Sequence, residues 1–524
     1  MAILGSILGK VLELRKSLPV VRIPRSNYQL QRSSFIRLLK KARYTQFGQH
    51  YGFDEILNSN NPMRAFQQRI PVFDYSKISR EWWHKSLNNE QDVCWPGVIK
   101  YFALSSGTSE AASKYIPVSN EMLRSIKRTS VRQIMTLSHY DIPDNLLEKG
   151  FLAIGGSTNL KSRGSYLEGD LSGITARNIP FWFQEFYKPG KEIAHERDWN
   201  TKIEKIVASA KDWDIGFLVG VPAWIQLIVE RVIEHYKLKN IHEIWPSLTV
   251  LVHGGVAFGP YRESIQKLCG KPLICIETYL ASEGFIAYQT RPGNHAMQLV
   301  LNNGLFFEFI PFNEENFTPD GSLKDNPRAL LIDEVQEGKE YAILLSTNAG
   351  AWRYLIGDTI RFTSKNKAEI VITGRTKHFI SLCGEHVSVD NMNQVVAHAA
   401  ENLSVSIQEF MVAGVPYNNM FAHHWYIGSD KAVDAEMVRN LLDERMKQIN
   451  DDYKTERISA LKEVIVEVLP LEVFHAWMDH KGKMGGQHKF PRVMKSNQLS
   501  EWQDFVRNTP KAWHSKSSAL IKNT

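Results

Sequence analysis

The feature of the sequence that most restricts the fold is a strand–helix–strand pattern near the middle of the chain. Residues 248–252 form an almost continuous apolar run, typical of a strand buried on both faces. Residues 260–268 begin at Pro260 and end shortly before Gly270, and these two residue types start and stop helices. Residues 273–279 read as a second strand. Two strands joined by a helix are parallel neighbours in a sheet, so this pattern predicts an α/β fold.

Polar turns follow both of these strands. Gly254 and Gly255 follow the first strand, and Glu283 follows the second. In open α/β sheets, ligands bind beyond the carboxyl ends of the strands, so both turns should face one crevice. Paired glycines let the backbone approach a planar base, and Tyr279 offers a ring for stacking. Glu283 could hold Mg²⁺, which takes one or two carboxylates plus phosphate oxygens, although a solvated turn carboxylate is the alternative.

A cluster of small polar residues lies between predicted strands at 98–104 and 114–118. It consists of Ser105, Ser106, Gly107, Thr108 and Ser109. Hydroxyls and backbone N–H groups on such a turn can hold phosphate oxygens, but the GxxxxGK[ST] spacing of a P-loop is absent. Ser119 and Glu121 then mark the start of a helix, so the cluster should close a hairpin. Taken alone, it is also compatible with an ordinary polar turn.

Two later motifs carry charged residues next to glycines. Asp358 follows Gly357 and could accept hydrogen bonds from both hydroxyls of a ribose, and Arg375 follows Gly374 and could add a charged contact. Lys489 lies in a glycine-flanked loop near the C-terminus and could stabilise charge that develops on an α-phosphate. The alternatives are a hairpin turn for the first motif and a solvated lysine for the last.

The length of 524 residues predicts two to four domains, because one hydrophobic core rarely extends that far. Short predicted strands suit a small antiparallel sheet or barrel, at residues 341–346, 352–356, 359–363 and 369–373. A new series of strands and a long amphipathic helix near 435–450 then indicates an α+β tail. We therefore expect an N-terminal domain at 1–377 and a C-terminal domain at 378–524.

Composition excludes several classes of protein. The excess of 63 Lys and Arg over 56 Asp and Glu gives a net charge of only +7, without a basic run that would indicate nucleic-acid binding. Four scattered cysteines predict neither a zinc site nor a disulfide framework, and they fit a reducing, cytoplasmic setting. No apolar run reaches the ~18 residues of a membrane span. An amphipathic stripe at 3–12 should pack against the protein, with peripheral membrane contact as the alternative.

Taken together, the motifs resemble those of the Gretchen Hagen family of acyl-acid amido synthetases, a branch of the adenylate-forming superfamily. The resemblance extends from about Ile99 to Val493. It rests on the Ser-Ser-Gly-Thr-Ser cluster, Lys114 to Pro117, Glu277 to Tyr279, Ser282 to Gly284, Tyr354 with Gly357 and Asp358, Gly374 with Arg375, and Lys489 to Val493.

The resemblance implies a large N-terminal adenylate-forming domain, with mixed sheets plus a small β-barrel, and a smaller, mobile α+β C-terminal domain. It implies MgATP as cofactor, with the polar cluster on the phosphates, Gly254, Gly255 and Tyr279 in the adenine region, Glu283 on the metal, Asp358 on the ribose, Arg375 at the hinge and on the nucleotide, and Lys489 in catalysis. Lys377 and His378 depart from the residues that end the superfamily's hinge motif.

The implied reaction is adenylation of a carboxylic acid followed by acyl transfer to an amine, for which an amino acid is expected. A thioester-forming acyl-CoA synthetase and a nucleotide-binding protein without catalysis are the alternatives. The acyl pocket should draw on the helix at 120–135 and on four aromatic residues, Phe181, Trp182, Phe217 and Trp224, for which ordinary core packing is the competing interpretation.

Overall fold

The computed structural model describes residues 25–105, 114–255, 258–318, 321–376, 379–380, 382–385, 387–429, 431–481, 490–494 and 496–508. The N-terminal stripe, Ser106 to Ser109, Lys377, His378 and Lys489 therefore lie outside the described residues, as does the side chain of Trp182. The chain divides between Lys377 and His378 into two compact units. The N-terminal unit is called the first unit and the C-terminal unit the second.

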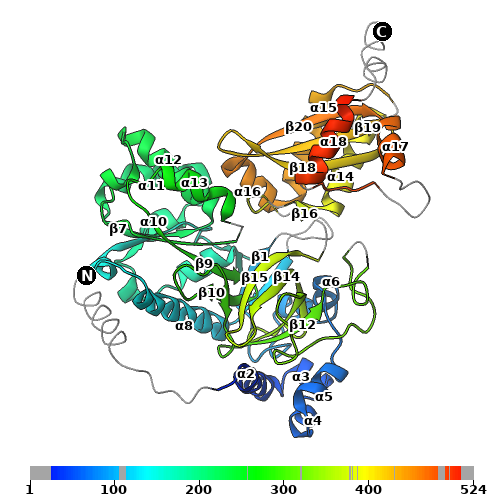
Figure 1. Cartoon of the computed structure of the whole chain (residues 1–524). Coiled ribbons are helices and arrows are strands. Elements are labelled where there is room, and N and C mark those ends of the chain that lie inside the picture. Colours follow the sequence, from blue (N-terminus) through cyan, green and yellow to red (C-terminus); the bar gives the residue numbers. More distant parts are fainter. Residues whose placement is uncertain are drawn as a thin grey trace. The chain divides into compact units, whose positions relative to one another are not determined.

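A large mixed sheet forms the centre of the first unit (Figure 1). In spatial order its strands are β12 (Leu305–Pro311), β13 (Glu340–Thr347), β14 (Tyr354–Ser364), β15 (Glu369–Arg375), β11 (Met297–Leu299), β10 (Gly284–Gln289), β9 (Ile274–Ala281), β8 (Val250–Gly254), β7 (Ile215–Gly220), β3 (Gly150–Ala153) and β6 (Tyr187–Lys188). The five strands from β9 to β6 are parallel to one another, and the remaining pairs are antiparallel. The predicted parallel strands with their connecting helix are thus confirmed as β8, α13 (Gly259–Lys267) and β9.

The strands predicted as a small barrel belong to this same sheet. They correspond to β13, β14 and β15, which pair antiparallel as expected, but β15 continues through β11 into the parallel half, so they form no separate barrel. The predicted strands at 352–356 and 359–363 are also one strand, β14. Gly357, at φ +92°, lies where the register with β13 shifts, so the glycine marks a bulge within the strand rather than its end.

A smaller sheet carries the polar cluster. Its order is β2 (Lys114–Val118), β1 (Tyr101–Ser105), β5 (Leu167–Gly169) and β4 (Lys161–Ser162). β1 and β2 are antiparallel, which confirms the predicted hairpin. Ser119 caps the next helix, α8 (Asn120–Thr136), by accepting a hydrogen bond from the N–H of Met122 at 3.0 Å, as its sequence position predicts.

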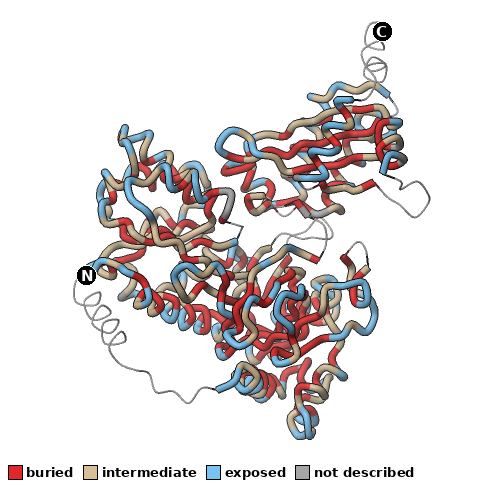
Figure 2. The backbone as a smooth tube through the Cα atoms, viewed as in Figure 1, coloured by how far each residue is buried: buried red, intermediate tan, exposed pale blue. Residues whose placement is uncertain are grey.

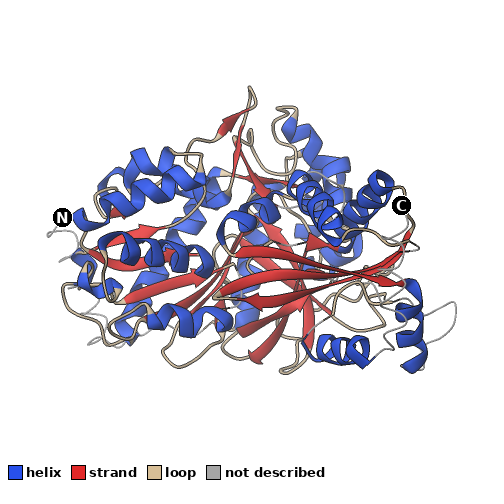
Figure 3. Ribbon diagram, turned by 90° about the horizontal axis from the view of Figure 1, so that it is seen from above, coloured by secondary structure: helices blue, strands red, loops and turns tan. Residues whose placement is uncertain are grey.

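Helices lie along the strands of the large sheet (Figure 3). α8 packs against β10, α12 (Pro222–Tyr236) against β7, and α2 (Asn27–Ala42) against β12. The other helices of this unit are α3 (Gln46–His50), α4 (Phe53–Asn58), α5 (Pro62–Arg69), α6 (Tyr75–Ile78), α7 (His84–Leu87), α9 (Leu171–Arg177), α10 (Gly190–His195) and α11 (Trp199–Ser209). Most of the residues along β12 and β13 are buried, so this half of the sheet carries much of the core (Figure 2). No described helix is both long enough and apolar enough to cross a membrane.

The second unit is an α+β structure, as predicted for the tail. Its sheet has the order β18 (Ile407–Tyr417), β19 (Met420–Ser429) and β20 (Leu461–Pro470). A short hairpin, β16 (Phe379–Ile380) and β17 (Val387–Ser388), precedes it. The helices are α14 (Val389–Leu403), α15 (Ala435–Ile449), α16 (Asp451–Ser459), α17 (Leu471–His480) and α18 (Ser496–Asn508). Phe490, directly after Lys489, is buried against Phe474 and Trp502, with ring centroids 4.9 and 5.3 Å away.

Candidate active site

Three of the predicted site residues contact one another in the first unit. The hydroxyl of Tyr279, on β9, donates a hydrogen bond to the carboxylate of Asp358, on β14. The Nε atom of Arg375 lies 3.2 Å from Oδ1 of the same carboxylate. Asp358 and Arg375 are direct cross-strand partners, which explains how residues 17 positions apart form an ion pair. The tertiary structure therefore links three predicted motifs through the carboxylate of Asp358: the adenine motif at Tyr279, the ribose motif at Asp358 and the hinge motif at Arg375.

Glu283 occupies the tight turn between β9 and β10, where Ala281 pairs with Gly284. Glu283 is only 8% exposed, so the alternative interpretation of a solvated turn carboxylate is wrong. Burial raises the pKa of Glu283 to about 7, while the positive charge of Lys114 opposes this shift. A carboxyl group with this pKa changes charge in the physiological range.

Lys114 is a site residue to which the sequence analysis assigned no role of its own. It begins β2 and is 9% exposed, and its ammonium lies 5.6 Å from the ring centroid of Tyr75. Burial lowers the pKa of Lys114 to about 8, Arg375 acts in the same direction, and Glu283 and Asp358 oppose them. One signal in the sequence could have revealed Lys114: it begins an otherwise apolar strand soon after the Ser/Gly/Thr cluster. A lysine is rarely buried without a partner, so a lysine in such a strand indicates a charged partner or ligand.

Tyr354 contributes a second phenol to this region. The side chain is 1% exposed, and its ring lies 5.4 Å from that of Trp83. Burial raises the pKa of Tyr354 well above its ordinary value, and the negative charge of Glu283 adds to the effect. The hydroxyl of Tyr354 therefore stays neutral at the pH values at which Glu283 ionises.

The polar cluster begins beside the buried lysine. Ser105 ends β1 and is the cross-strand partner of Lys114, so the chain leaves the hairpin and re-enters it at this pair. The placement of Ser106, Gly107, Thr108 and Ser109 on phosphate oxygens remains a prediction.

The glycine pair at the end of β8 is explained by close packing at Gly254 and by backbone conformation at Gly255. A Cβ atom on Gly254 would lie 2.3 Å from the carbonyl oxygen of Thr278, on the neighbouring strand β9. Gly255 has φ +87°, in the left-handed region that favours glycine. These two residues bring the end of β8 against the residue that precedes Tyr279, while contact with an adenine base stays a prediction.

The aromatic residues predicted for the acyl pocket lie in different surroundings. Phe181 is 83% exposed. Phe217 joins an apolar cluster with Leu137 and Tyr140, and Trp224 lies against Trp199 with a centroid distance of 4.5 Å. The role of these three residues in acyl binding stays a prediction.

The helix predicted to contribute to the acyl pocket does border a cavity. α8 and the start of β10 enclose a small space that could hold about one water molecule. It is lined by Met122, Ser125, Ile126, Thr129, Gly284, Phe285, Asn303, Leu305 and Asn348. The cavity borders the turn that carries Glu283, but it is too small for an acyl group, and a role for α8 in acyl binding stays a prediction.

Three family models match successive parts of the chain. They describe the GH3 family N-terminal domain, over residues 22–210, the GH3 family central domain, over 298–375, and the GH3 family C-terminal domain, over 390–498. The mixed α/β architecture and the clustered charges fit this assignment. The chain belongs to the GH3 family, which confirms the resemblance inferred from its motifs.

Relatives of known name share low identity over most of the chain. Jasmonoyl–L-amino acid synthetase JAR4 of Nicotiana attenuata is 20% identical over 93% of this chain and 94% of its own length. Jasmonoyl–L-amino acid synthetase GH3.5 of Oryza sativa subsp. japonica is 22% identical over 94% and 97%. Indole-3-acetic acid-amido synthetase GH3.4 of Arabidopsis thaliana is 23% identical over 60% of this chain and 56% of its own length.

Solved structures share the fold. The AtGH3.15 acyl acid amido synthetase in complex with 2,4-DB matches with a TM-score of 0.57 at 16% identity, covering 95% of this chain and 96% of that one. A 2-hydroxyisobutyryl-CoA ligase in complex with 2-HIB-AMP and CoA matches with a TM-score of 0.56 at 13% identity, covering 93% and 97%. The fold is therefore common to amide-forming and thioester-forming ligases.

Proposed function

We propose that this protein is an ATP-dependent acyl-acid amido synthetase that joins a carboxylic acid to an amine, specifically that of an amino acid. The observation that carries the proposal is the cluster of Lys114, Glu283, Asp358 and Arg375. Two cations and two carboxylates suit a ligand that bears both phosphate groups and ribose hydroxyls. The GH3 relatives, named as jasmonoyl–L-amino acid and indole-3-acetic acid-amido synthetases, support the same reaction class.

The proposed reaction has two steps. An oxygen of the substrate carboxylate attacks the α-phosphorus of ATP, the bond to the bridging oxygen breaks, and pyrophosphate leaves. The nitrogen of the amine then attacks the acyl carbon of the acyl-adenylate. AMP leaves with the electrons of the broken C–O bond, and the nitrogen loses a proton to give the amide. Because no covalent enzyme intermediate is needed, the protein contributes mainly orientation and electrostatic stabilisation.

Different residues are assigned to different parts of the ATP molecule. Asp358 has acceptor capacity beyond its contacts to Tyr279 and Arg375, and it is assigned to the ribose hydroxyls. Lys114 is assigned to the phosphates together with the Ser/Gly/Thr cluster, because it is buried beside Ser105. Lys489 is assigned to the charge that develops at the α-phosphate.

Mg²⁺ fits this site through a single carboxylate. The described residues contain no group of three or more His, Cys, Asp or Glu side chains placed to share a metal. Mg²⁺ bound with a nucleotide needs only one or two protein carboxylates, and Glu283 is the residue that would supply one. When bound, the ion would neutralise phosphate charge and favour departure of pyrophosphate.

A reducing, cytoplasmic setting is part of the proposal. Cys94, Cys269, Cys275 and Cys383 are all free thiols, and burial raises the pKa of each. Free thiols with raised pKa values are poor nucleophiles, so they suit packing rather than catalysis.

The test is a screen of carboxylic acids crossed with free amino acids and with coenzyme A. Acid-dependent pyrophosphate release, followed by AMP and amide formation only when an amino acid is present, is the expected result. Thioester formation with coenzyme A would establish the acyl-CoA synthetase alternative. ATP binding without pyrophosphate release for any acid would support a nucleotide-binding protein without catalysis.

A further inference from the structure

Arg353, directly before β14, has a backbone conformation that is unusual for its residue type. Its φ of +42° lies in the left-handed region, which is unfavourable for a residue that has a Cβ atom. Residues held in such conformations persist where the surroundings determine them strongly, and they concentrate at functional sites. The environment of Arg353 therefore merits a functional explanation.

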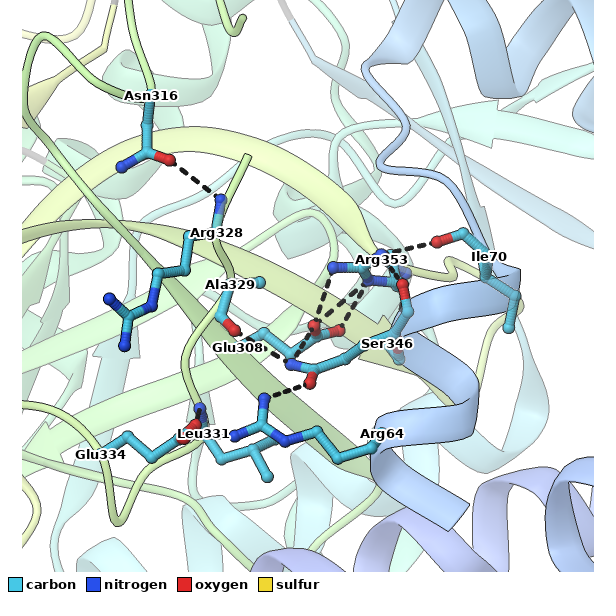
Figure 4. A network of polar contacts seen from close by, with 11 residues as sticks. Arg64, Ile70, Glu308, Asn316, Arg328, Ala329, Leu331, Glu334, Ser346 and Arg353 are labelled. Atoms are coloured by element: carbon cyan, nitrogen blue, oxygen red, sulfur yellow. Dashed lines mark hydrogen bonds and ion pairs between the residues drawn. The ribbon is translucent and has the colours of Figure 1, made fainter. Parts of the chain in front are cut away.

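The guanidinium of Arg353 is buried and fully engaged (Figure 4). Its Nε atom lies 3.2 and 3.1 Å from the two carboxylate oxygens of Glu308 on β12. One terminal nitrogen donates to the carbonyl oxygens of Gln67 and Ile70, at 2.9 and 2.6 Å, and the other lies 3.1 Å from Glu308. One side chain thus connects the end of α5 to the large sheet.

The main chain of Arg353 repeats this connection. Its N–H donates to Oγ of Ser346 at 3.0 Å, and its carbonyl accepts from the N–H of Phe73 at 3.0 Å. The N–H of Leu355 in turn donates to the carbonyl of Phe73 at 2.8 Å, so Phe73 pairs with Tyr354 as a short parallel bridge. The segment after α5 is therefore joined to β14 by both side-chain and backbone bonds.

Two parts of the candidate active site depend on these two segments. Along β14, Arg353 precedes Tyr354 and Asp358. Along the other segment, the hydroxyl of Tyr75 accepts a hydrogen bond from the N–H of Tyr115 at 2.9 Å, and its ring lies beneath the ammonium of Lys114. Arg353 thus joins the segment that leads to Tyr75 to the strand that carries Tyr354 and Asp358.

Stability alone gives a weak reason for such a pair. A buried ion pair recovers the cost of removing two charges from water only with full hydrogen bonding, and apolar replacements often match it. What an apolar replacement cannot supply is a fixed connection from Glu308 to the carbonyls of Gln67 and Ile70. The geometry is thus better suited to positioning than to adding stability.

We propose that Arg353 and Glu308 are positioning residues for the nucleotide site, which hold Tyr354 and Asp358 in place relative to Tyr75 and Lys114. This inference rests on the proposed function, because it assigns the positioned groups to ATP. Neither residue touches the nucleotide; each acts through the segments that it joins.

The test uses Arg353→Lys and Glu308→Gln in the full chain. Lysine keeps a charge opposite Glu308 but cannot also reach both carbonyls, and glutamine keeps the shape but removes the charge. We expect KM for ATP to rise about tenfold or more, because small misplacements of binding groups are costly, with a smaller effect on KM for the acid. We also expect the pH profile of kcat/KM for ATP to shift, since Lys114 and Glu283 would change surroundings.

The matched control is Arg457→Lys in the second unit. Arg457 also pairs through Nε with a carboxylate, Asp443 at 2.8 Å, and donates to a backbone carbonyl, that of Leu461 at 2.6 Å. This variant should lower the melting temperature while leaving KM for ATP and the pH profile as in wild type. If either Arg353→Lys or Glu308→Gln fails to fold, Gln67→Leu keeps the Arg353–Glu308 pair. It removes the bonds that the Gln67 amide donates to Glu308 at 3.0 Å and to the carbonyl of Ala329 at 3.2 Å, and the bond that it accepts from Arg64 at 2.6 Å, and it should shift KM for ATP less, in the same direction.

Folded variants with wild-type KM for ATP and an unchanged pH profile would overturn the inference and leave a purely structural pair. A wild-type protein that neither binds ATP nor releases pyrophosphate would instead contradict the proposed function. The two failures are therefore distinguishable.

Discussion

At the scale of single residues, Glu283 and Lys114 determine how the site responds to pH. The pKa of Glu283 is raised to about 7 and that of Lys114 is lowered to about 8, so the charged forms of both coexist only in a narrow range. If Mg²⁺ needs the carboxylate and the phosphates need the ammonium, both must be charged for ATP to bind.

The first prediction is a bell-shaped pH dependence of kcat/KM for ATP. The rate constant should rise as Glu283 loses its proton near pH 7 and fall as Lys114 loses its proton near pH 8, because kcat/KM reports the free enzyme. Lys114→Arg should extend the alkaline limb, since guanidinium remains charged. Glu283→Gln should remove the acidic limb together with most of the magnesium dependence. A flat profile between pH 6 and 9 in wild type would contradict the assignment of both residues.

The second prediction concerns stability at the same carboxyl group. The folded-state pKa of Glu283 is above its unfolded value, so its contribution to stability is fully present at pH values below the unfolded pKa and is lost as the pH rises through about 7. Glu283→Gln should therefore raise the free energy of unfolding at pH 8, by up to about 3 kcal/mol, and change it little at pH 4. Urea unfolding at the two pH values measures this, and an equal effect at both would be inconsistent with a buried carboxylate.

The third prediction is that Lys489→Ala slows adenylation by about two orders of magnitude or more, the scale for losing one preorganised charge. Folding should be almost unchanged. Lys481→Ala is the control, since Lys481 lies only a few residues earlier in the sequence and pairs on the surface with Glu501. Pyrophosphate release by Lys489→Ala at the wild-type rate would remove Lys489 from the site.

At the scale of secondary-structure elements, the close approach of β8 and β9 positions Thr278 and, after it, Tyr279. The fourth prediction is that Gly254→Ala destabilises the protein, since its Cβ would lie 2.3 Å from the backbone oxygen of Thr278, which cannot move aside like a side chain. Overpacking of this kind costs about 1–3 kcal/mol, and the displaced Tyr279 should also weaken ATP binding.

Gly338→Ala provides the comparison for backbone strain, because Gly338 also has a positive φ of +78° but no atom within 4 Å of the added carbon. It should lose stability without losing affinity for ATP. Calorimetry of both variants with and without ATP separates the two effects. An unaltered ATP affinity in Gly254→Ala would show that this contact does not position the site.

At the scale of the whole molecule, the chain forms two compact units that divide at Lys377 and His378. The domain boundaries at 1–377 and 378–524, and movement about this junction, remain predictions. The chemical argument is that Lys489 is needed at the α-phosphate during adenylation, whereas the amine must later reach the acyl carbon. A rotation about a few residues would serve both steps.

The fifth prediction is that Lys377→Pro affects the two half-reactions unequally, because proline fixes φ at the junction. Single-turnover assays should show adenylation and amide formation changing by different factors. The control is Lys377→Ala. A proline elsewhere in the chain, such as Lys365→Pro, would not serve, because the backbone N–H of Lys365 donates a hydrogen bond to Glu337 that proline would remove. A folded Lys377→Pro protein that retains both half-reactions, or loses both in equal proportion, would end the hinge proposal at this residue.

Local features of the fold could be predicted from the sequence because they depend on residues close together in the chain. The unit of β8, α13 and β9, the hairpin of β1 and β2, the cap at Ser119 and the α+β tail were all predicted correctly. Apolar periodicity, caps and turn residues encode such elements within about ten to twenty positions. The candidate motifs could also be found, because polar and charged residues beside glycines stand out near the ends of predicted strands, where α/β proteins bind ligands. Asp358 is the exception in the structure, because it lies within β14.

Only the tertiary structure decided which of these residues meet and how strongly they are buried. Lys114 becomes a site residue because Tyr75, Glu283 and Arg375 surround it, although they are far apart in the chain. β14 is one strand because its neighbours pair across the Gly357 bulge, and the supposed barrel is part of the large sheet because β11 connects β15 to β10. Desolvation and strand pairing are set by distant segments, and a local pattern carries no information about either.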